Sequence, residues 1–412
     1  MDERISTYLV GGAIRDKALG LESFDRDWVV VGATPQHMAD LGYEPVGKDF
    51  PVFINKKSGE EYALARTERK TAKGYQGFQF NASSEITLEQ DLARRDITIN
   101  AMAEDENGNL IDPFNGMQDL QDGVIRHVSD AFIEDPVRIL RVARFAARFK
   151  FTIAEETKEL LEAMVNNGEV DALVPERVWT EMCKALNTDS PQLFFQTLRD
   201  CGALARVLPE IDSLFGVPQT AKYHPEIDTG VHTLMVIEQA TKITTDPLVR
   251  FAALVHDLGK AITPKDILPS HRGHETSGLP LIKTLCERLR VPKKYRDLAL
   301  AVAEYHLHMH KMYDLKASTI LKMLHNTKSL NDDQRALQIA QSCLADARGR
   351  TGFEDSDYPQ SDLFLEFQRA AKSVNGGEIA KGMQDGQLIQ AAISAAQLEK
   401  IRSVQTTIKP KN

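Results

Sequence analysis

The chain has 412 residues, of which 42% are hydrophobic and 26% charged, the composition of a globular protein long enough for two to four domains. Its 50 basic and 59 acidic residues leave a net charge of −9, which argues against holding nucleic acid by bulk charge but allows a local basic surface. The four cysteines are scattered and form no CxxC pair, which predicts reduced, mostly buried residues. The sequence shows no signal-peptide pattern and no apolar run near the roughly 20 residues of a membrane helix. We therefore expect a soluble, cytoplasmic protein without a membrane partner.

The first 125 residues mix short β-like runs with turns that contain Gly, Pro and Asn. A short helix over 13–20, ending at Gly20, is expected between the first two runs. The α+β character stops near residue 128, so the first domain is placed at 1–128. The expected strands are 7–12, 27–32, 51–57, 60–67 and 108–114.

Beyond residue 128 apolar residues recur at helical spacing, and the rest of the chain is predicted to be all-α. The fold class is therefore α+β at the N-terminus followed by helical domains. A break rich in Pro and Gly near residue 225 separates a helical part at 129–225 from a second one at 228–350, which carries most of the histidines. A more polar helical tail is expected at 351–412. Helices are expected over 135–151, 154–168, 175–188 and 191–211.

Asp25 and Asp27 stand one residue apart at the start of the expected strand 27–32. Because side chains alternate along a strand, the two carboxylates face the same way, and they repel each other unless a cation lies between them. Mg²⁺ favours carboxylates together with substrate phosphates. On its own, however, a DxD tripeptide is more often a solvated pair of acids on an edge strand.

The segment before the aspartates, "LVGGAIRD", reads as a strand, a Gly-Gly turn and a helix. Glycines let the backbone approach a phosphate closely, and a helix N-terminus offers free N–H groups. We expect Gly12 at this turn and Arg15 on the helix to bind a nucleotide phosphate.

The order GG-x-x-RD followed by DxD resembles the signature of the nucleotidyltransferase superfamily, in its branch of tRNA nucleotidyltransferases and poly(A) polymerases. Segments 93–103, 134–149 and 63–75 are similar to that branch's RRD-x-T-x-N-A motif, EDxxR element and mobile loop. The resemblance covers about the first 150 residues and implies a polymerase β-like head over 1–128. It also implies that Asp25 and Asp27 are catalytic and bind Mg²⁺, and that Arg95 contacts the triphosphate of CTP or ATP.

Four arginines at helical spacing fall within one arc roughly 120° wide, a pattern that alone is typical of a solvated face. They are Arg138, Arg141, Arg144 and Arg148. Asp135 is expected on the first turn of the same helix, where its acceptors and the donors of Arg138 can match a base edge. The resemblance implies that Asp135 and Arg138 read the incoming C or A and that Arg141 and Arg144 contact the nucleotide. The resemblance also implies that residues 129–225 form the neck and body that read the base.

A His-Asp pair, His256 and Asp257, stands in the apolar segment "FAALVHDLGK", which predicts a helix. Together with His232 and Asp346 the pattern resembles the HD phosphohydrolase superfamily, which implies an HD domain at 228–350 with these four residues at its metal site. Imidazole plus carboxylate suits a transition metal better than Mg²⁺, and the resemblance implies Ni²⁺. It also implies phosphatase, 2′-nucleotidase and 2′,3′-cyclic phosphodiesterase activity.

Other histidines of this segment are weaker candidates. His271, His274 and His306 are expected to line the substrate cleft, whereas nothing in the sequence favours His308 or His310. A bare His-Asp pair is more often a satisfied core histidine beside an N–H acceptor, so the prediction depends on the spacing of all four metal-site residues.

The whole pattern resembles the bacterial class II CCA-adding enzymes with an HD domain, which add C, C and A to the 3′ end of tRNA from CTP and ATP without a nucleic-acid template. A poly(A) polymerase of the same branch is the alternative, and the intact HD pattern argues against it. A tRNA-binding protein with a decayed transferase site is a third hypothesis, opposed by the intact acidic and basic residues. The sequence does not select Glu60 or Glu61 as a third carboxylate, nor a monomer or a homodimer.

Overall fold

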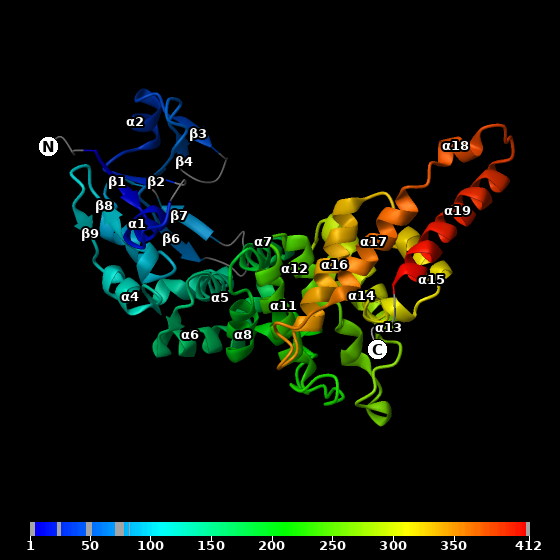
Figure 1. Cartoon of the computed structure of the whole chain (residues 1–412). Coiled ribbons are helices and arrows are strands. Elements are labelled where there is room, and N and C mark those ends of the chain that lie inside the picture. The colour runs from blue at the N-terminus through cyan, green and yellow to red at the C-terminus, as the bar shows by residue number, and fades with distance from the viewer. Residues whose placement is uncertain (1–4, 23–25, 47–51, 71–77, 82, 409–412) are drawn as a thin grey trace. The chain divides into compact units, whose positions relative to one another are not determined.

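The computed structural model describes residues 5–22, 26–46, 52–70, 78–81 and 83–408. The chain divides into two compact units. Figure 1 shows the chain coloured from blue at the N-terminus to red at the C-terminus. The first unit contains Met1–Glu181 and Gln196–Val207, and the second contains Met182–Phe195 and Leu208–Asn412. This division is coarser than the four parts expected from the sequence, whose limits stay a prediction.

A mixed sheet forms the centre of the first unit, and within the described residues its order is β3-β4-β5-β2-β1-β8-β9. β1 pairs antiparallel with β2, whereas β2 pairs parallel with β5. The predicted α+β head is thereby confirmed. The strands are β1 (Ser6–Val10), β2 (Asp27–Val31), β3 (Glu44–Val46), β4 (Val52–Ile54), β5 (Glu61–Leu64), β8 (Ala103–Glu104) and β9 (Leu110–Ile111).

The core of this unit lies against the sheet. Val10 and Val29, from the middle strands, are buried with Leu92, Ala101 and Ala103. Burial of such side chains contributes about 1.5–3 kcal/mol for each large one, so this cluster fixes the strands that end at the cavity described below. The surrounding elements are α1 (Gly12–Ala18), α2 (Pro35–Asp40), α3 (Leu88–Ala93), α4 (Gly116–Asp122), the strand pair β6 (Thr67–Lys70) and β7 (Phe78–Asn81), and the strand pair β10 (Val124–Ile125) and β11 (Thr152–Ile153).

The helix that carries the arginines is α5 (Val137–Phe149). Pro136 precedes it with φ −62°, a value already suited to a helix start, and Lys150 ends it in the left-handed region at φ 58°. One face buries Ile139, Leu140 and Val142, so packing holds the helix while its arginines face the cavity. The following helices are α6 (Glu155–Asn166), α7 (Pro175–Leu186), α8 (Gln192–Asp200) and α9 (Ala203–Val207).

The helical segment predicted over 191–211 is interrupted twice. Gly202, with φ 76°, ends α8, and Pro209 starts the short α10 (Pro209–Asp212). A residue with positive φ cannot continue a right-handed helix, and proline lacks the N–H that the preceding turn would use.

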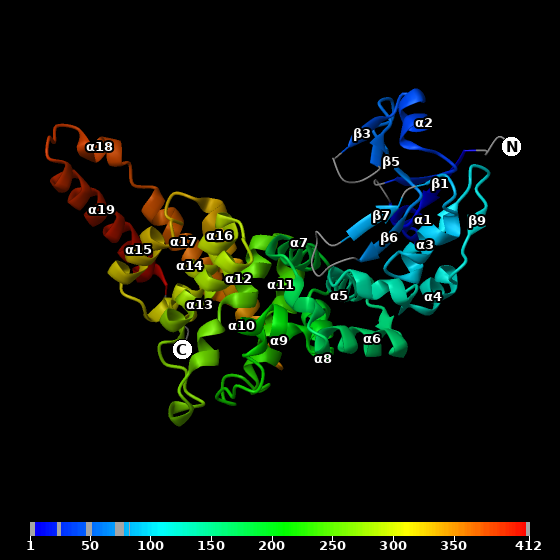
Figure 2. The same cartoon turned by 180° about the vertical axis from the view of Figure 1, so that it is seen from behind.

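The second unit is helical in its described residues, as predicted. α11, α12, α14 and α16 pack against one another, α13 packs on α14 and on the 3-10 turn η5 (Leu258–Ile262), and α19 packs on α15 and α17 (Figure 2). The helices are α11 (Thr229–Ile243), α12 (Pro247–Val255), α13 (His274–Arg288), α14 (Lys293–His310), α15 (Ala317–Asn326), α16 (Asp333–Arg348), α17 (Pro359–Lys372), α18 (Gly376–Ala380) and α19 (Gly386–Thr407).

Close approach of η5 to α13 depends on a glycine. A Cβ at Gly259 would lie 2.0 Å from the carbonyl oxygen of His274, so no other residue fits without moving the backbone. This contact brings the segment after α12 next to the start of α13.

The cysteines are free, with Cys201, Cys286 and Cys343 buried and Cys183 half-buried. Among the described residues, no helix combines the length and apolarity needed to cross a bilayer.

Candidate functional site

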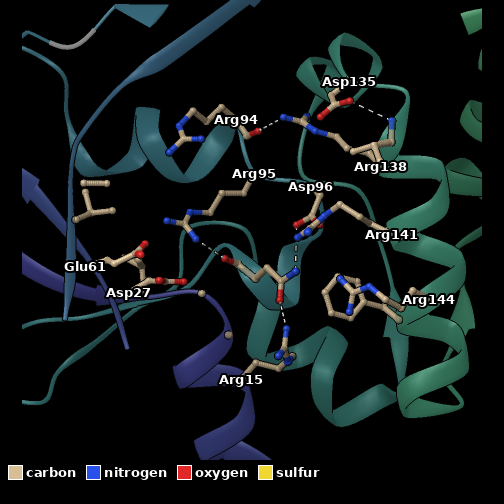
Figure 3. A pocket seen from close by; sticks show the side chains of 18 of the residues that line it. Arg15, Asp27, Glu61, Arg94, Arg95, Asp96, Asp135, Arg138, Arg141 and Arg144 are labelled. Carbon is tan, nitrogen blue, oxygen red and sulfur yellow. Dashed lines mark hydrogen bonds and ion pairs between the residues drawn. The ribbon is translucent and has the colours of Figure 1, made fainter. Parts of the chain in front are cut away.

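A cavity of about 510 Å³ in the first unit gathers most of the residues expected to act on a nucleotide (Figure 3). Its lining includes Gly12, Arg15, Asp27, Arg95, Asp135, Arg138, Arg141 and Arg144. Asp25 lies outside the described residues, and so does the segment 71–75 of the expected loop. Elements that are distant in the sequence, namely α1, β2, the segment after α3 and α5, thus contribute to one site.

Two carboxylates stand together on one wall of this cavity. Asp27 begins β2 and lies in register opposite Glu61 on the parallel strand β5, and both side chains line the cavity (Figure 3). The neighbouring Glu60 instead forms an ion pair with Arg26 (Nη1–Oε1 3.6 Å). The structure therefore selects Glu61 rather than Glu60 as the acid beside Asp27. Two adjacent carboxylates on one wall of a cavity fit a divalent cation.

The turn between β1 and α1 allows an arginine to come close to the backbone. Gly11 has φ 71°, and a Cβ there would lie 2.8 Å from Nη1 of Arg95, so this position requires glycine. Nη1 of Arg95 donates to the carbonyl of Asn100 (3.3 Å), and Nη2 pairs with Oδ2 of the fully buried Asp91 (3.4 Å). Burial opposes ionisation of Asp91, but Arg94 and Arg95 outweigh it and lower its pKa.

Arg15 is held from two directions inside the same cavity. Its Nε donates to Oδ1 of Asp16 (2.9 Å), and Nη1 donates to Oδ1 of Asn100. Its guanidinium also lies over the ring of Phe149, 5.0 Å from the centroid. Only 3% of Arg15 is exposed, so its direction is set by the fold rather than by solvent.

Of the four arginines of α5, Arg138 and Arg144 are buried, Arg141 is half-buried and Arg148 is exposed, so the stripe is not the solvated face that such a pattern usually makes. Arg138 donates to the carbonyls of Ala131 (2.7 Å) and Arg94 (2.6 Å). Nε of Arg141 donates to Oδ2 of Asp96 (2.6 Å). Burial works against the charge of Asp96, yet Arg141 and Asn100 overcome it and hold its pKa well below the usual range.

Asp135 does not lie on the first turn of α5, so that part of the prediction is wrong. Its backbone is extended at φ −120° and ψ 106°, because a residue before proline is disfavoured in the helical region. Its carboxylate accepts the backbone N–H of Val137 (3.0 Å) and faces Arg177, which donates Nη1 to Oδ1 (3.0 Å) and Nη2 to Oδ2 (2.6 Å). Asp135 and Arg138 both line the cavity, but each is bonded to other groups.

Arg177 and Glu181 on α7 were not identified from the sequence. Arg177 binds Asp135 at the start of α5, and Glu181 accepts from Nε of Arg144 (2.5 Å) two turns later. In the sequence these two residues are only an arginine and a glutamate one helical turn apart, a spacing that is common on any helix. Their partners lie more than 30 residues away, so sequence spacing did not reveal them.

Arginines outnumber carboxylates among the residues that line the cavity, although the whole chain is acidic. A cleft lined mostly by one sign of charge concentrates the opposite sign. The cavity therefore suits a polyphosphate, with a carboxylate pair on one side and fixed donors on the other.

The four residues expected at the second site converge inside the second unit. Nε2 of His232 lies 3.2 Å from Oδ1 of Asp346, and Nε2 of His256 lies 3.6 Å from the same atom and 3.3 Å from Oδ2 of Asp257. All four residues are almost fully buried. The His-Asp pair is not within a helix as expected, because α12 ends at Val255 and Asp257 precedes η5. This end of the helix turns both side chains toward one centre.

Backbone and acidic acceptors fix the tautomers of these histidines. Nδ1 of His232 faces the carbonyl of Gly349 and Oε1 of Glu226, each at 2.9 Å, and Nδ1 of His256 faces the carbonyl of Ala253 (2.8 Å). Donation from Nδ1 orients each Nε2 toward the centre, and in a neutral ring this nitrogen carries the lone pair that metal-bound histidines use. Nε2 of His256 and both carboxylate oxygens of Asp257 are buried and make no directed hydrogen bond in the described part of the chain, although Nζ of Lys260 forms an ion pair with Oδ2 of Asp257 (2.6 Å). These atoms fit a divalent metal ion.

Further side chains surround this centre. Nζ of Lys260 lies 2.6 Å from Oδ2 of Asp257, and Nε2 of His310 lies 2.7 Å from Oδ2 of Asp346. His310 had no support from the sequence, because its role depends on α14 packing beside α16. His271, which is expected to line the substrate cleft, bonds Thr263 (2.7 Å) and the carbonyl of Pro218 (3.0 Å).

Comparison with known families identifies three segments of the chain. Residues 7–126 match the poly A polymerase head domain, and residues 229–346 match the HD domain. Residues 150–215 match a family described as "Probable RNA and SrmB- binding site of polymerase A".

Curated relatives match nearly the whole chain. A multifunctional CCA protein of Laribacter hongkongensis is 55% identical over 404 residues, covering 98% of this chain and 100% of the relative. One of Methylobacillus flagellatus is 57% identical over 392 residues, covering 95% of each.

Solved structures share the fold at lower identity. The CCA-adding enzyme of Bacillus stearothermophilus in complex with CTP is 22% identical, with a TM-score of 0.66 over 97% of this chain and 89% of that chain. The Thermotoga maritima CCA-adding enzyme complexed with tRNA is 21% identical, with a TM-score of 0.63 over 98% of this chain and 92% of that chain.

Proposed function

This chain belongs to the family of multifunctional CCA proteins, and we propose that it adds C, C and A to the 3′ end of tRNA from CTP and ATP without a nucleic-acid template. The observation that carries the proposal is the cavity in which a Gly-Gly turn, a carboxylate pair and fixed arginines meet. Similarity to multifunctional CCA proteins over both units favours this function over that of a poly(A) polymerase.

In the proposed reaction, the 3′-hydroxyl of tRNA attacks the α-phosphate of CTP or ATP in line, and pyrophosphate leaves. Asp25 and Asp27 would hold Mg²⁺, with Glu61 beside Asp27, and the ion would neutralise phosphate charge and orient the attacking oxygen. Gly12 lets the backbone approach the triphosphate, and Arg15 and Arg95 donate to its oxygens.

Base selection is assigned to the other wall of the cavity. Asp135 accepts and Arg138 donates toward the edge of the incoming base, and Arg141 and Arg144 hold the nucleotide. Because their present partners are protein groups, nucleotide binding would exchange some of these hydrogen bonds for contacts with the base.

We propose a second activity for the HD domain, metal-dependent hydrolysis of phosphate esters. His232, His256, Asp257 and Asp346 would hold the metal, for which Ni²⁺ is the proposed ion, and that metal would supply a water of lowered pKa. The proposed substrates are phosphate monoesters, 2′-nucleotides and 2′,3′-cyclic phosphodiesters. The protein is proposed to act in the cytoplasm as a monomer or homodimer.

Incorporation of labelled nucleotides into tRNA that lacks its CCA end tests the transferase proposal. CTP alone should extend this tRNA by two residues, ATP alone should not extend it, and both together should restore CCA. Long adenylate tails from ATP alone would instead indicate a poly(A) polymerase. Binding of tRNA without incorporation of either nucleotide would indicate a binding protein.

A further inference from the structure

Arg148, the last arginine of the stripe on α5, lines the nucleotide cavity but has no part in the function proposed above. Its side chain is 37% exposed, whereas Arg15 is almost fully buried. Nη2 of Arg148 donates to Oδ2 of Asp16 (3.0 Å), and within the described residues this is the only hydrogen bond of its guanidinium group. Because a guanidinium carries five N–H donors, the others can serve a ligand in the cavity.

Asp16 connects Arg148 to Arg15. Oδ1 of Asp16 accepts from Nε of Arg15 (2.9 Å) and pairs with its Nη2 (2.8 Å), while Oδ2 accepts from Arg148. The ring of Phe149 lies beside both guanidinium groups, with its centroid 5.0 Å from Cζ of Arg15 and 4.8 Å from Cζ of Arg148. One carboxylate and one aromatic ring therefore hold the two arginines at the same end of the cavity.

These charged groups are not balanced among themselves. Two guanidinium groups share a single carboxylate, so the trio carries a net positive charge. Burial lowers the pKa of Arg15, Asp16 raises it, and the neighbouring charge of Arg148 lowers it. An anion beside Arg148 would reduce the repulsion between the two arginines and neutralise the remaining charge.

The position of Arg148 along α5 separates it from the residues assigned to the base. Asp135 precedes the helix and Arg138 lies on its first turn, whereas Arg148 lies near its last residue, about 15 Å further along the axis. Arg15, which is assigned to the triphosphate, is bonded to the same carboxylate as Arg148. The two ends of α5 therefore correspond to the two ends of a nucleotide in the cavity.

We propose that Arg148, together with Arg15, binds the terminal phosphates of CTP and ATP, the part of the nucleotide that leaves as pyrophosphate. The inference rests on the proposed nucleotidyl transfer and adds a phosphate ligand to the same site. Guanidinium groups match phosphate oxygens in geometry as well as in charge. A backbone phosphate of tRNA has the same chemistry, so the test must separate these two sources.

Binding of pyrophosphate and of CMP to the full-length chain, measured by isothermal titration calorimetry with Mg²⁺, separates the phosphate end of the site from the base end. Arg148→Met removes the charge but keeps the aliphatic length beside Phe149, and Arg148→Lys keeps the charge. The matched control is Arg126→Met. Arg126 is 39% exposed and pairs with the mostly buried Asp119 (Nε–Oδ2 3.2 Å), but it does not line the cavity. Steady-state incorporation gives KM for CTP and for tRNA lacking CCA.

Arg148→Met should weaken pyrophosphate binding about tenfold and raise KM for CTP by a similar factor, the effect of a lost hydrogen bond between charged groups. Its affinity for CMP and its KM for tRNA should stay within about twofold, because neither depends on the terminal phosphates. Arg148→Lys should bind pyrophosphate only about threefold more weakly than wild type, since the charge remains without the planar donors. Arg126→Met should bind it as wild type does.

Unchanged pyrophosphate affinity in Arg148→Met would overturn the inference, and a raised KM for tRNA in that case would assign the residue to the tRNA backbone. Equal losses of pyrophosphate affinity in Arg148→Met and Arg148→Lys, with lowered unfolding temperatures, would reduce Arg148 to a structural contact and also overturn it. Charge-dependent pyrophosphate binding by a protein that adds no nucleotide to tRNA would support the inference and refute the proposed function. Normal CCA addition by Arg148→Met with an unchanged KM for CTP would do the reverse.

Discussion

Asp27 and Glu61 face each other because β2 and β5 pair in parallel register, with one residue opposite the other. The alternation of a strand explains why Asp27 points into the cavity, and this could be predicted from a few residues. The choice between Glu60 and Glu61 could not be predicted from the sequence, because it depends on which residue of β5 lies opposite Asp27. Register is set by pairing between segments more than 30 residues apart, which a single sequence does not display.

Removal of the Glu61 carboxylate should therefore impair nucleotidyl transfer. We expect Glu61→Ala to lower kcat/KM for CTP incorporation at least about 100-fold, since a metal ion contributes several kcal/mol of charge stabilisation in such reactions. Glu60→Ala is the matched control, because Glu60 pairs with Arg26, and its rate should stay within about twofold. Steady-state incorporation into tRNA lacking CCA measures both, and equal losses would contradict the assignment of Glu61.

Asp96 gives the first unit a defined response to acid. Burial raises the pKa of Asp96, but the charge of Arg141 and the hydrogen bond from Asn100 lower it by more, so its pKa in the folded protein is depressed. The unfolded chain therefore takes up this proton first as the pH falls. The stabilisation is fully present above the unfolded pKa of about 3.9 and is lost as the pH falls toward the folded value. Asp96→Asn should cost about 1–3 kcal/mol of unfolding free energy at pH 7 and less near pH 3.

Urea unfolding followed by tryptophan fluorescence measures this difference, because both tryptophans, Trp28 and Trp179, belong to the first unit. Asp122→Asn, at an exposed site on α4, is the control and should leave the unfolding free energy almost unchanged at every pH. A difference between wild type and Asp96→Asn that stays constant from pH 7 to pH 3 would refute the depressed pKa of Asp96.

At the scale of the elements, α7 stabilises α5 at two points, through Arg177 with Asp135 and through Glu181 with Arg144. The helical period predicted both helices, and it placed the arginines of α5 on one face. It did not predict where helices end: Pro136 keeps Asp135 outside α5, and α12 ends before His256. Helix ends depend on caps and on tertiary contacts, so the residues at these ends, which carry much of the chemistry, were the least predictable.

The bidentate contact from α7 should affect base selection. Arg177→Ala frees the carboxylate of Asp135, and we expect kcat/KM for CTP to fall about tenfold or more relative to UTP, because a hydrogen bond to a charged group is worth about 1.5–3 kcal/mol. Arg177→Lys should not restore selectivity, since an ammonium lacks the planar pair of donors. The exposed Arg199→Ala on α8 is the control. Unchanged discrimination between CTP and UTP in Arg177→Ala would show that this contact serves stability alone.

At the scale of the whole molecule, each site is built within one unit. The cavity uses residues before Glu181, and the histidine centre uses residues after Gly216, so no described side chain belongs to both. Composition and periodicity predicted this change from α+β to all-α. They did not predict that His310 and Lys260 reach the second centre, because those contacts arise only when helices pack.

Separate construction of the two sites predicts separable activities. His256→Ala removes a proposed ligand of the HD site, so hydrolysis of 2′,3′-cyclic nucleotides should fall below detection while CCA incorporation stays within about twofold, the scatter expected for sites that share no side chain. Asp27→Ala should show the opposite pattern. Both activities are measured on the same preparations, with thermal unfolding as the control for folding. If His256→Ala lost both activities while retaining its unfolding temperature, the sites would be energetically coupled, and a description of the protein as two independent catalytic units would be wrong.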